Sequence, residues 1–322
     1  METLMKRVNL PQLARQQGIL IAFVIFLAVV AASSDTFLTT GNILQVLRQA
    51  SILGTMALGV TFVVICGRLD LSVGSALSLT TVLVVDLHDK IGPGPAILVT
   101  LVAGLLVGVV NGLLIGYVRL NSLIVTLGML STLQGVTLIY TGGKNVSVAN
   151  PEATWFGFFG RGHFLDIPVP VWIFLGGAAV LGVILARTSY GRQVYAVGGN
   201  ETASRFSGVN ARRIVFSAYL LSGLTTAVAA VIMGSRVMGS QNNVGQGYEL
   251  QVLAGIILGG TSLLGGSGTL LKTVIGIAIL GFIENGLLLL GYPYYVQWLV
   301  TWAVIIGAVW LDVASKRGRL FV

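Results

Sequence analysis

Acidic side chains in long apolar runs are the first candidates for chemistry in this chain of 322 residues. Four of its eleven Asp and Glu residues lie in or beside such runs: Asp70, Asp86, Glu249 and Glu284. An ionisable group at the centre of a membrane span costs about 2.5–3.5 kcal/mol on insertion scales, so each needs a partner or water. For Glu284, beside Asn285, two interpretations stay open. It faces a wet substrate cavity, or it makes a hydrogen bond between helices.

The common catalytic and nucleotide-binding motifs are absent from the sequence. It contains no GxxxxGK[ST], GxSxG, HExxH or CxxC. His88 and His163 fall in predicted outer connections, and the single cysteine, Cys66, lies in an apolar run, where we interpret it as a small buried hydrophobic residue. We therefore expect no catalytic residue, no metal site and no cofactor on this chain. If transport is active, another polypeptide hydrolyses ATP or an ion gradient drives it.

Composition indicates that these residues belong to a membrane protein. Hydrophobic residues make up 55% of the chain and charged residues 9%, whereas a soluble domain carries about 25% charged residues. The mean hydropathy is +0.91, and the apolar character is spread over the whole length. This predicts an all-α polytopic membrane protein. The net charge of +8 comes mostly from short segments between apolar runs, so it indicates topology rather than nucleic-acid binding.

The chain contains ten apolar runs that approach the roughly 20 residues of one membrane crossing. Several are short or interrupted by glycine, and the first follows basic residues, which favours an uncleaved signal anchor. The ten runs are 18–34, 46–66, 72–87, 95–118, 121–141, 169–186, 214–236, 249–264, 269–290 and 295–313.

Basic residues predict that both termini are cytoplasmic. With the N-terminus inside, the positive-inside rule is satisfied, because most of the 19 Lys and Arg residues then face the cytoplasm. The exceptions are Arg48, Lys90, Lys144, Arg161 and Arg236.

A glycine stripe marks the fourth run. Gly104, Gly108, Gly112 and Gly116 recur every four residues and so lie on one helix face. Such a stripe lets a neighbouring helix backbone approach closely. We predict a helix-packing seam; the alternative is that Asn111 and Gly112 widen a pathway.

Two connections are long enough to carry a function. Residues 142–168, expected outside the cell, mix turn residues with aromatics, which indicates an interfacial cap or a docking surface for an external partner. Residues 187–213 are expected inside. There Asn200 is a good N-cap, Glu201 lies in the first turn, and Gly208 can end a short helix over about 201–207. This helix either contacts anionic lipid as part of a solvated loop or docks a cytoplasmic partner.

Two segments predict broken membrane helices. In CGRLDLSVGSALSL a helix stops at Gly67, and Asp70 or Ser72 can cap a new helix that contains Gly74 and Ser75. In the second half, LGGTSLLGGSGTLL has a similar order: an apolar helix, a break of glycine and hydroxyl residues, and a new apolar helix. Paired glycine-interrupted segments point to an internal repeat and a transport pathway.

Together these motifs resemble the permease subunit of the bacterial ABC importers for monosaccharides, the ribose, xylose, arabinose and galactose group. The resemblance runs from about Asn42 to Asp312. The segments that carry it are GRLDLSVGSALSL (67–79), IVTLGMLSTLQGVTLIYTGG (124–143), YGRQVYAVGGNETASRFSGVN (190–210), GYELQVLAGIILGGTSLLGGSGT (247–269) and IENGLLLLG (283–291).

The resemblance implies a single permease domain over residues 1–322, multi-pass in the bacterial inner membrane, that pairs with a second permease copy as a homodimer or heterodimer. It implies two further partners, a cytoplasmic ATPase that binds ATP and Mg, and an extracytoplasmic sugar-binding protein. In such systems a cytoplasmic loop of the permease docks on the ATPase. That role falls here to Gly191, Arg192, Gly199, Asn200, Glu201 and Gly208.

Some positions depart from the family pattern. Arg68 stands where a small or apolar residue is expected, Gln251 where Asp often follows Tyr-Glu-Leu, and Glu284 where an amide is usual. Residues 120–122 replace an apolar or proline-containing approach to the fifth run. The electrostatics of a ribose-type permease therefore do not carry over unchanged.

We expect alternating access, in which ATP-driven closure on the cytoplasmic side opens the permease inward. Three other hypotheses stay open. They are an ion-coupled secondary carrier that uses Asp70 and Glu284, a membrane enzyme for lipid-linked sugars, and a permease for branched-chain amino acids. The residues predicted to line the pathway are Asn111, Gln134, Tyr140, Glu284 and Asn285.

Overall fold

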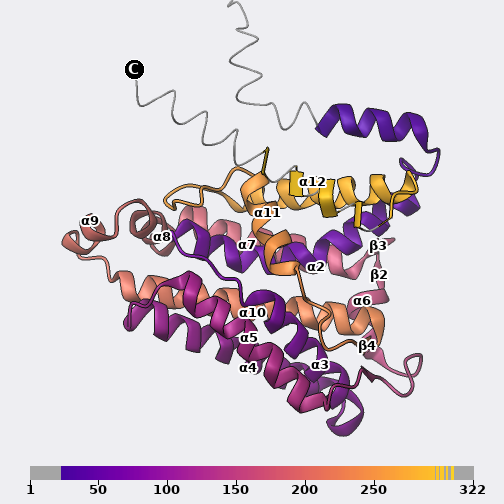
Figure 1. Cartoon of the computed structure of the whole chain (residues 1–322), viewed down its shortest axis with the longest axis horizontal. Coiled ribbons are helices and arrows are strands. Elements are labelled where there is room, and N and C mark those ends of the chain that lie inside the picture. Colours follow the sequence, from indigo (N-terminus) through magenta and orange to yellow (C-terminus); the bar gives the residue numbers. More distant parts are fainter. Residues whose placement is uncertain (1–22, 294, 297, 301, 304–305, 308–322) are drawn as a thin grey trace, which may run out of the picture. The chain divides into compact units, whose positions relative to one another are not determined.

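The computed structural model describes residues 23–293, 295–296, 298–300, 302–303 and 306–307 (Figure 1). Both predicted cytoplasmic termini, the start of the first run and much of the run 295–313 lie outside the described residues. The chain divides into two compact units, one of residues 47–278 and one of residues 1–46 with 279–322.

The described residues are mainly helical, as predicted. A short apolar helix, Phe23–Ser33, precedes the labelled elements. These are α2 (Thr40–Ile65), α3 (Val73–Ile91), α4 (Pro93–Gly112), the π-helix η1 (Leu113–Tyr117), α5 (Ser122–Thr141), β1 (Val146–Ser147), the 3₁₀-helix η2 (Trp155–Gly157), α6 (Phe158–Arg161), β2 (His163–Phe164), β3 (Ile167–Pro168), α7 (Val169–Arg187), α8 (Ser189–Gly199), α9 (Glu201–Phe206), α10 (Ala211–Val237), β4 (Gly239–Ser240), α11 (Tyr248–Leu258) and α12 (Leu270–Leu289).

Six helical segments in the described part of the chain are long and apolar enough to cross a membrane. They are Thr40–Ile65, Pro93–Tyr117, Ser122–Thr141, Val169–Arg187, Ala211–Val237 and Leu270–Leu289. The apolar segment of α2 is 89% buried, whereas that of α5 is only 17% buried. A helix that is apolar all round and buried belongs in a core, and one whose apolar side chains remain exposed is suited to lipid.

In the larger unit α4 packs closely against α10, which confirms the predicted glycine seam. The missing side chain of Gly104 makes room for Gly223 and Ala227, and that of Gly108 makes room for the backbone of Tyr219. Gly112 and Gly116 face the next turns of α10 in the same way. Small residues at this spacing let the two helix backbones touch, which increases their van der Waals contact.

A second core of the larger unit surrounds α2. Ile52 and Met56 of α2, Ile232 of α10 and Ile256 of α11 are all nearly or fully buried in one apolar cluster. Hydroxyl groups within these helices donate to carbonyls of the preceding turn, as Thr55 does to Ser51 at 2.7 Å. These buried hydroxyl groups are thereby satisfied without water.

Both predicted helix breaks are present. The first separates α2 from α3, with Gly67 in the left-handed region at φ +72°. The second separates α11 from α12. The run 249–264 is not one span, because α11 ends at Leu258, where Gly259 and then Gly260 (φ +87°) interrupt it. Its 11 residues extend about 16 Å, too short to cross a bilayer.

The connection 142–168 folds into a cap over one end of the larger unit, and its short strands were not predicted from the sequence. β1 pairs antiparallel with β4, which follows α10, and β2 pairs with β3. Phe156 is fully buried, and the Gly160 N–H donates to Ser235 Oγ of α10 at 2.8 Å. Figure 1 shows α8 and α9 at the opposite end of this unit.

The smaller unit contains the start of α2 and the second half of α12. Asn42 and Asn285 exchange two amide hydrogen bonds, each 2.9 Å long. The rings of Phe37 and Phe282 meet edge to face at 6.2 Å between centroids. Gly286 accommodates the ring of Phe26.

The seam predicts the effect of a bulky side chain at its centre. Gly108→Leu forces α4 away from the α10 backbone, and overpacking of this kind costs about 1–3 kcal/mol. We expect a lower thermal unfolding midpoint for the detergent-solubilised protein. Gly128→Leu is the matched control, since nothing lies within 4 Å of a Cβ at that exposed position of α5. Equal midpoints for the two variants would contradict the seam.

Candidate functional site

The first candidate site is the helix pair α8–α9 in the connection 187–213. Its second helix spans Glu201–Phe206, close to the predicted 201–207, and Asn200 Oδ1 accepts the Ala203 N–H at 2.9 Å as an N-cap. Gly208 follows in the left-handed region at φ +83°, as predicted. The short helix and its caps are therefore confirmed; its docking role stays a prediction.

Two contacts join α8 to the neighbouring helices α7 and α10. Gly191 packs against the last turn of α7, where a side chain would meet the Leu185 carbonyl. The hydroxyls of Tyr190 and Ser217 lie 2.9 Å apart, which joins α8 to α10. Burial raises the pKa of Tyr190 to about 12, so this phenol stays neutral. The helix pair is therefore anchored at its start, while Arg192 is exposed.

Phe206, at the end of α9, is the docking candidate that the sequence interpretation missed. Its side chain is 90% exposed. A large aromatic side chain at the tip of a polar helix is unusual for a surface that contacts only water. Aromatic residues are enriched in the cores of protein interfaces. The signal in the sequence was a phenylalanine in the last turn of an otherwise polar helix.

Beside α9 lies a charged pocket of about 360 Å³. Arg68 and Glu201 form an ion pair across it, 2.7 Å from Nη2 to Oε2. Arg119 and Arg212 also line it. Arg119 adopts a left-handed conformation at φ +65°, two residues after the end of the π-helix η1. Arg68, one of the departures from the family pattern, is thus the partner of a predicted docking residue.

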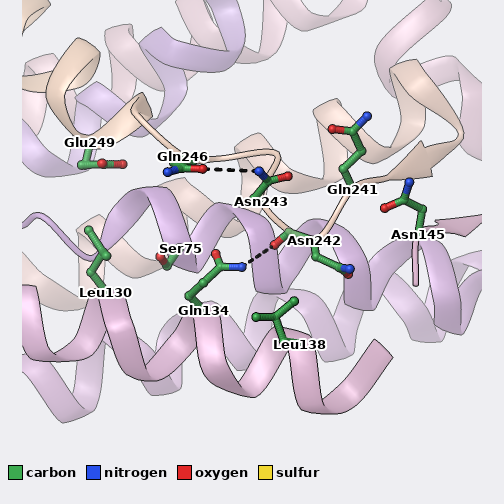
Figure 2. Close-up of a pocket in the computed structure, with 10 residues that line it drawn as sticks. All are labelled: Ser75, Leu130, Gln134, Leu138, Asn145, Gln241, Asn242, Asn243, Gln246 and Glu249. Carbon is green, nitrogen blue, oxygen red and sulfur yellow. Dashed lines mark hydrogen bonds between the residues drawn. The ribbon is translucent and has the colours of Figure 1, made fainter. Parts of the chain in front are cut away.

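The second candidate site is a pocket of about 560 Å³ between α3, α5 and the segment that leads into α11 (Figure 2). Of the described residues that line it, six carry amides, one carries a hydroxyl and one a carboxylate, and none is basic. The lining residues are Ser75, Leu130, Gln134, Leu138, Asn145, Gln241, Asn242, Asn243, Gln246 and Glu249.

Hydrogen bonds inside this amide pocket fix only part of its polar surface. Gln134 Nε2 donates to the Asn242 carbonyl at 3.1 Å, and Asn243 Nδ2 donates to Gln246 Oε1 at 3.3 Å (Figure 2). The remaining donors and acceptors suit a neutral, hydroxyl-rich ligand, because an amide can both donate to a hydroxyl and accept from one.

Glu249 reaches the pocket because Gly74 has no side chain. A Cβ at Gly74 would meet the Glu249 carboxylate and the Gly245 carbonyl. Glu249 Oε1 accepts the Gly247 N–H at 3.3 Å. Its Oε2 is buried and has no hydrogen-bond partner within the described part of the chain. The predicted broken-helix residues Gly74 and Ser75 therefore lie at the pocket, and Glu249 contributes a carboxylate to it.

The other predicted broken-helix residues form a buried cluster at the start of α3. Asp70 Oδ1 accepts from the Ser72 N–H and Oγ–H, at 3.1 and 2.6 Å, and Oδ2 accepts from Ser222 Oγ at 2.7 Å. Asn111 Nδ2 donates to Ser72 Oγ at 2.8 Å. Ser72 occupies the N-cap position without a side-chain cap of its own, so Asp70 provides the capping acceptor.

The structure separates the predicted pathway residues. Gln134 lines the amide pocket, whereas Asn111 is held in the Asp70 cluster. Tyr140 donates to Asp86 Oδ2 at 2.5 Å. Glu284 and Asn285 belong to the smaller unit. No group of three or more His, Cys, Asp or Glu side chains that could hold a metal occurs among the residues described.

Comparisons with known proteins agree with this architecture. The chain is 40% identical over 304 residues to the ribose import permease protein RbsC of Escherichia coli (strain K12), covering 92% of this chain and 93% of that relative. It is 39% identical over 318 residues to RbsC of Bacillus subtilis (strain 168), covering 97% of each. It is 33% identical over 312 residues to the L-arabinose ABC transporter permease protein AraH of Azospirillum brasilense, covering 96% and 90%.

No solved structure gives a significant match to the chain. A family model described as "Branched-chain amino acid transport system / permease component" matches residues 42–309. The match includes both helix breaks, the α8–α9 pair and the amide pocket. The chain therefore belongs to this family of transport-system permeases.

Proposed function

We propose that this chain is the permease subunit of an ABC importer that moves a monosaccharide across the bacterial inner membrane, and that the amide pocket contacts the sugar on its way. The lining of the pocket is the observation that carries the proposal. Six amides, a serine and one carboxylate offer hydrogen bonds to hydroxyls. The relatives named for ribose and L-arabinose support the same substrate class.

The charges of the pocket argue against a branched-chain amino acid. A zwitterion needs a countercharge for its carboxylate, and no Lys or Arg lines the pocket among the residues that the structure describes. Glu249 supplies one negative charge only. Glu249 lines the pocket, so its carboxylate can accept a hydrogen bond from a sugar hydroxyl.

The ion-coupled carrier has little support from Asp70. Both oxygens of this buried carboxylate already accept hydrogen bonds from serine side chains. We propose instead that ATP and Mg bind to a cytoplasmic ATPase that docks on α8–α9, with Arg192 and Phe206 exposed toward it. No nucleotide is expected to bind this chain itself.

The docking of the ATPase on α8–α9 also determines how the chain is oriented in the membrane. We propose that α9 and both termini face the cytoplasm, and that the cap of residues 142–168 faces outward, toward a sugar-binding protein. The five basic residues expected outside include Arg161, which lies in the cap and donates to the Arg236 carbonyl at 2.9 Å. A second copy of the permease completes the translocation path.

Glu249→Gln tests the contact with the sugar. The substitution keeps the shape of the side chain but removes its charge, and a hydrogen bond to a charged group contributes about 1.5–3 kcal/mol. We expect uptake of radiolabelled ribose or L-arabinose, whichever the parent carries, to fall about tenfold or more at unchanged membrane abundance. Asp35→Asn, at an exposed position, is the control. Uptake at the parental rate by Glu249→Gln would remove Glu249 from the site.

Phe206→Ser tests the docking surface. Burial of a phenylalanine contributes about 1.5–3 kcal/mol, so the variant should retain about a tenth or less of the ATPase that co-purifies with the parent. Phe164→Ser is the matched control, because Phe164 is also exposed and lies in the cap at the other end of the larger unit. Equal ATPase recovery from both variants would place the docking surface elsewhere.

A further inference from the structure

Both helix breaks meet the α8–α9 pair at one junction of backbone. The Gly266 N–H donates to the Ile65 carbonyl at 2.8 Å, which joins the α11–α12 break to the end of α2. Gly198, near the end of α8, lies against both groups, since a Cβ there would overlap the Ile65 carbonyl and the Gly266 nitrogen. We call Ile65, Gly67, Gly198, Gly265 and Gly266 the glycine junction.

Glycine is required at this junction for contact as well as conformation. Gly67, Gly265 and Gly266 all have φ between +72° and +85°, a region that glycine enters without steric cost. A Cβ at Gly265 would lie 2.8 Å from the Gly67 Cα and from the Gly198 carbonyl. Three chain segments therefore touch backbone to backbone, with no flexible side chain between them. A displacement of α8 is passed directly to both breaks.

Two side-chain links reinforce the junction. Arg68, next to Gly67, pairs with Glu201 in the first turn of α9 at 2.7 Å, and both side chains are about one third exposed. Tyr195 of α8 donates to the Gly268 carbonyl in the α11–α12 break at 2.7 Å. The first link therefore leads to the α2–α3 break and the second to the α11–α12 break.

From the junction, each break leads to the amide pocket. The first break continues through the buried Asp70 cluster into α3, where Ser75 lines the pocket. The second continues backwards along α11, whose 11 residues span about 16 Å and carry Glu249 in the first turn, at the pocket. Ser75 is the third residue of α3 and α11 has 11 residues, so each route from a break to the pocket is short.

From this geometry we infer that the Arg68–Glu201 ion pair and Gly198 are positioning residues that couple movement of α8–α9 to the amide pocket. The inference rests on the proposed function, because it supposes that ATP-driven closure moves α8–α9. It adds a defined route for that movement, and it gives a role to the arginine that departs from the family pattern.

Charge reversal tests the ion pair. The permease is reconstituted into liposomes with its co-purified ATPase and its sugar-binding protein, and labelled ribose or L-arabinose is counted per ATP hydrolysed. We expect Arg68→Glu and Glu201→Arg each to lower this ratio about fivefold or more. The double variant, which restores an opposite-charge pair, should recover most of it. Lys90→Glu, which breaks an ion pair with Asp86 outside the cap and away from the glycine junction, is the matched control.

Gly198→Ala tests the junction without a change in charge. Its methyl group must displace the Ile65 carbonyl, so the sugar-to-ATP ratio should fall, whereas Gly176→Ala, with nothing within 4 Å of its Cβ, should retain the parental ratio.

The outcomes separate this inference from the proposed function. A parent that shows no ATP-dependent uptake overturns the proposed function. A working parent with unchanged ratios in Gly198→Ala and in both single charge variants overturns the inference alone. If the double variant of Arg68→Glu and Glu201→Arg folds no better, or transports no more sugar per ATP, than the worse single variant, the role of the ion pair is also overturned.

Discussion

A break in a membrane helix leaves backbone N–H and C=O groups that lipid cannot satisfy, and most of the site geometry of this chain follows from that constraint. The first break uses Asp70, with Ser72, Ser222 and Asn111 completing a buried network. The second uses backbone of the first, through the Gly266 to Ile65 hydrogen bond. Each break therefore depends on another element for its hydrogen bonds.

Glycine makes this dependence possible in a chain of mostly apolar helices. The α4–α10 seam gives the larger unit a packed interface in which four glycines face one helix. The same residue type, in left-handed conformations, makes the glycine junction. The seam suits a fixed scaffold, whereas the junction joins short elements that end at the amide pocket. The high glycine content, 43 of 322 residues, therefore serves two physical purposes.

The sequence predicted the elements better than the contacts between them. Periodic glycines identified the seam, and cap residues identified α9 to within a residue at each end, because both signals are local. The two-residue strands were missed, since apolar composition does not reveal where a loop pairs. The break after α11 was predicted, but the apolar run was extended to residue 264, six residues beyond the end of α11 at Leu258. Of the predicted pathway residues only Gln134 lines the amide pocket. The other amides between residues 241 and 246 lie far from Gln134 in the sequence, and no local sequence pattern indicates that they meet it.

If ATP hydrolysed on a partner drives sugar through this permease, sugar should accumulate in proteoliposomes that contain the permease, its ATPase and its binding protein. Measured with labelled sugar, this accumulation should require ATP and should persist when an ionophore collapses every ion gradient. Accumulation that occurs without ATP and is abolished by the ionophore would instead indicate an ion-coupled carrier.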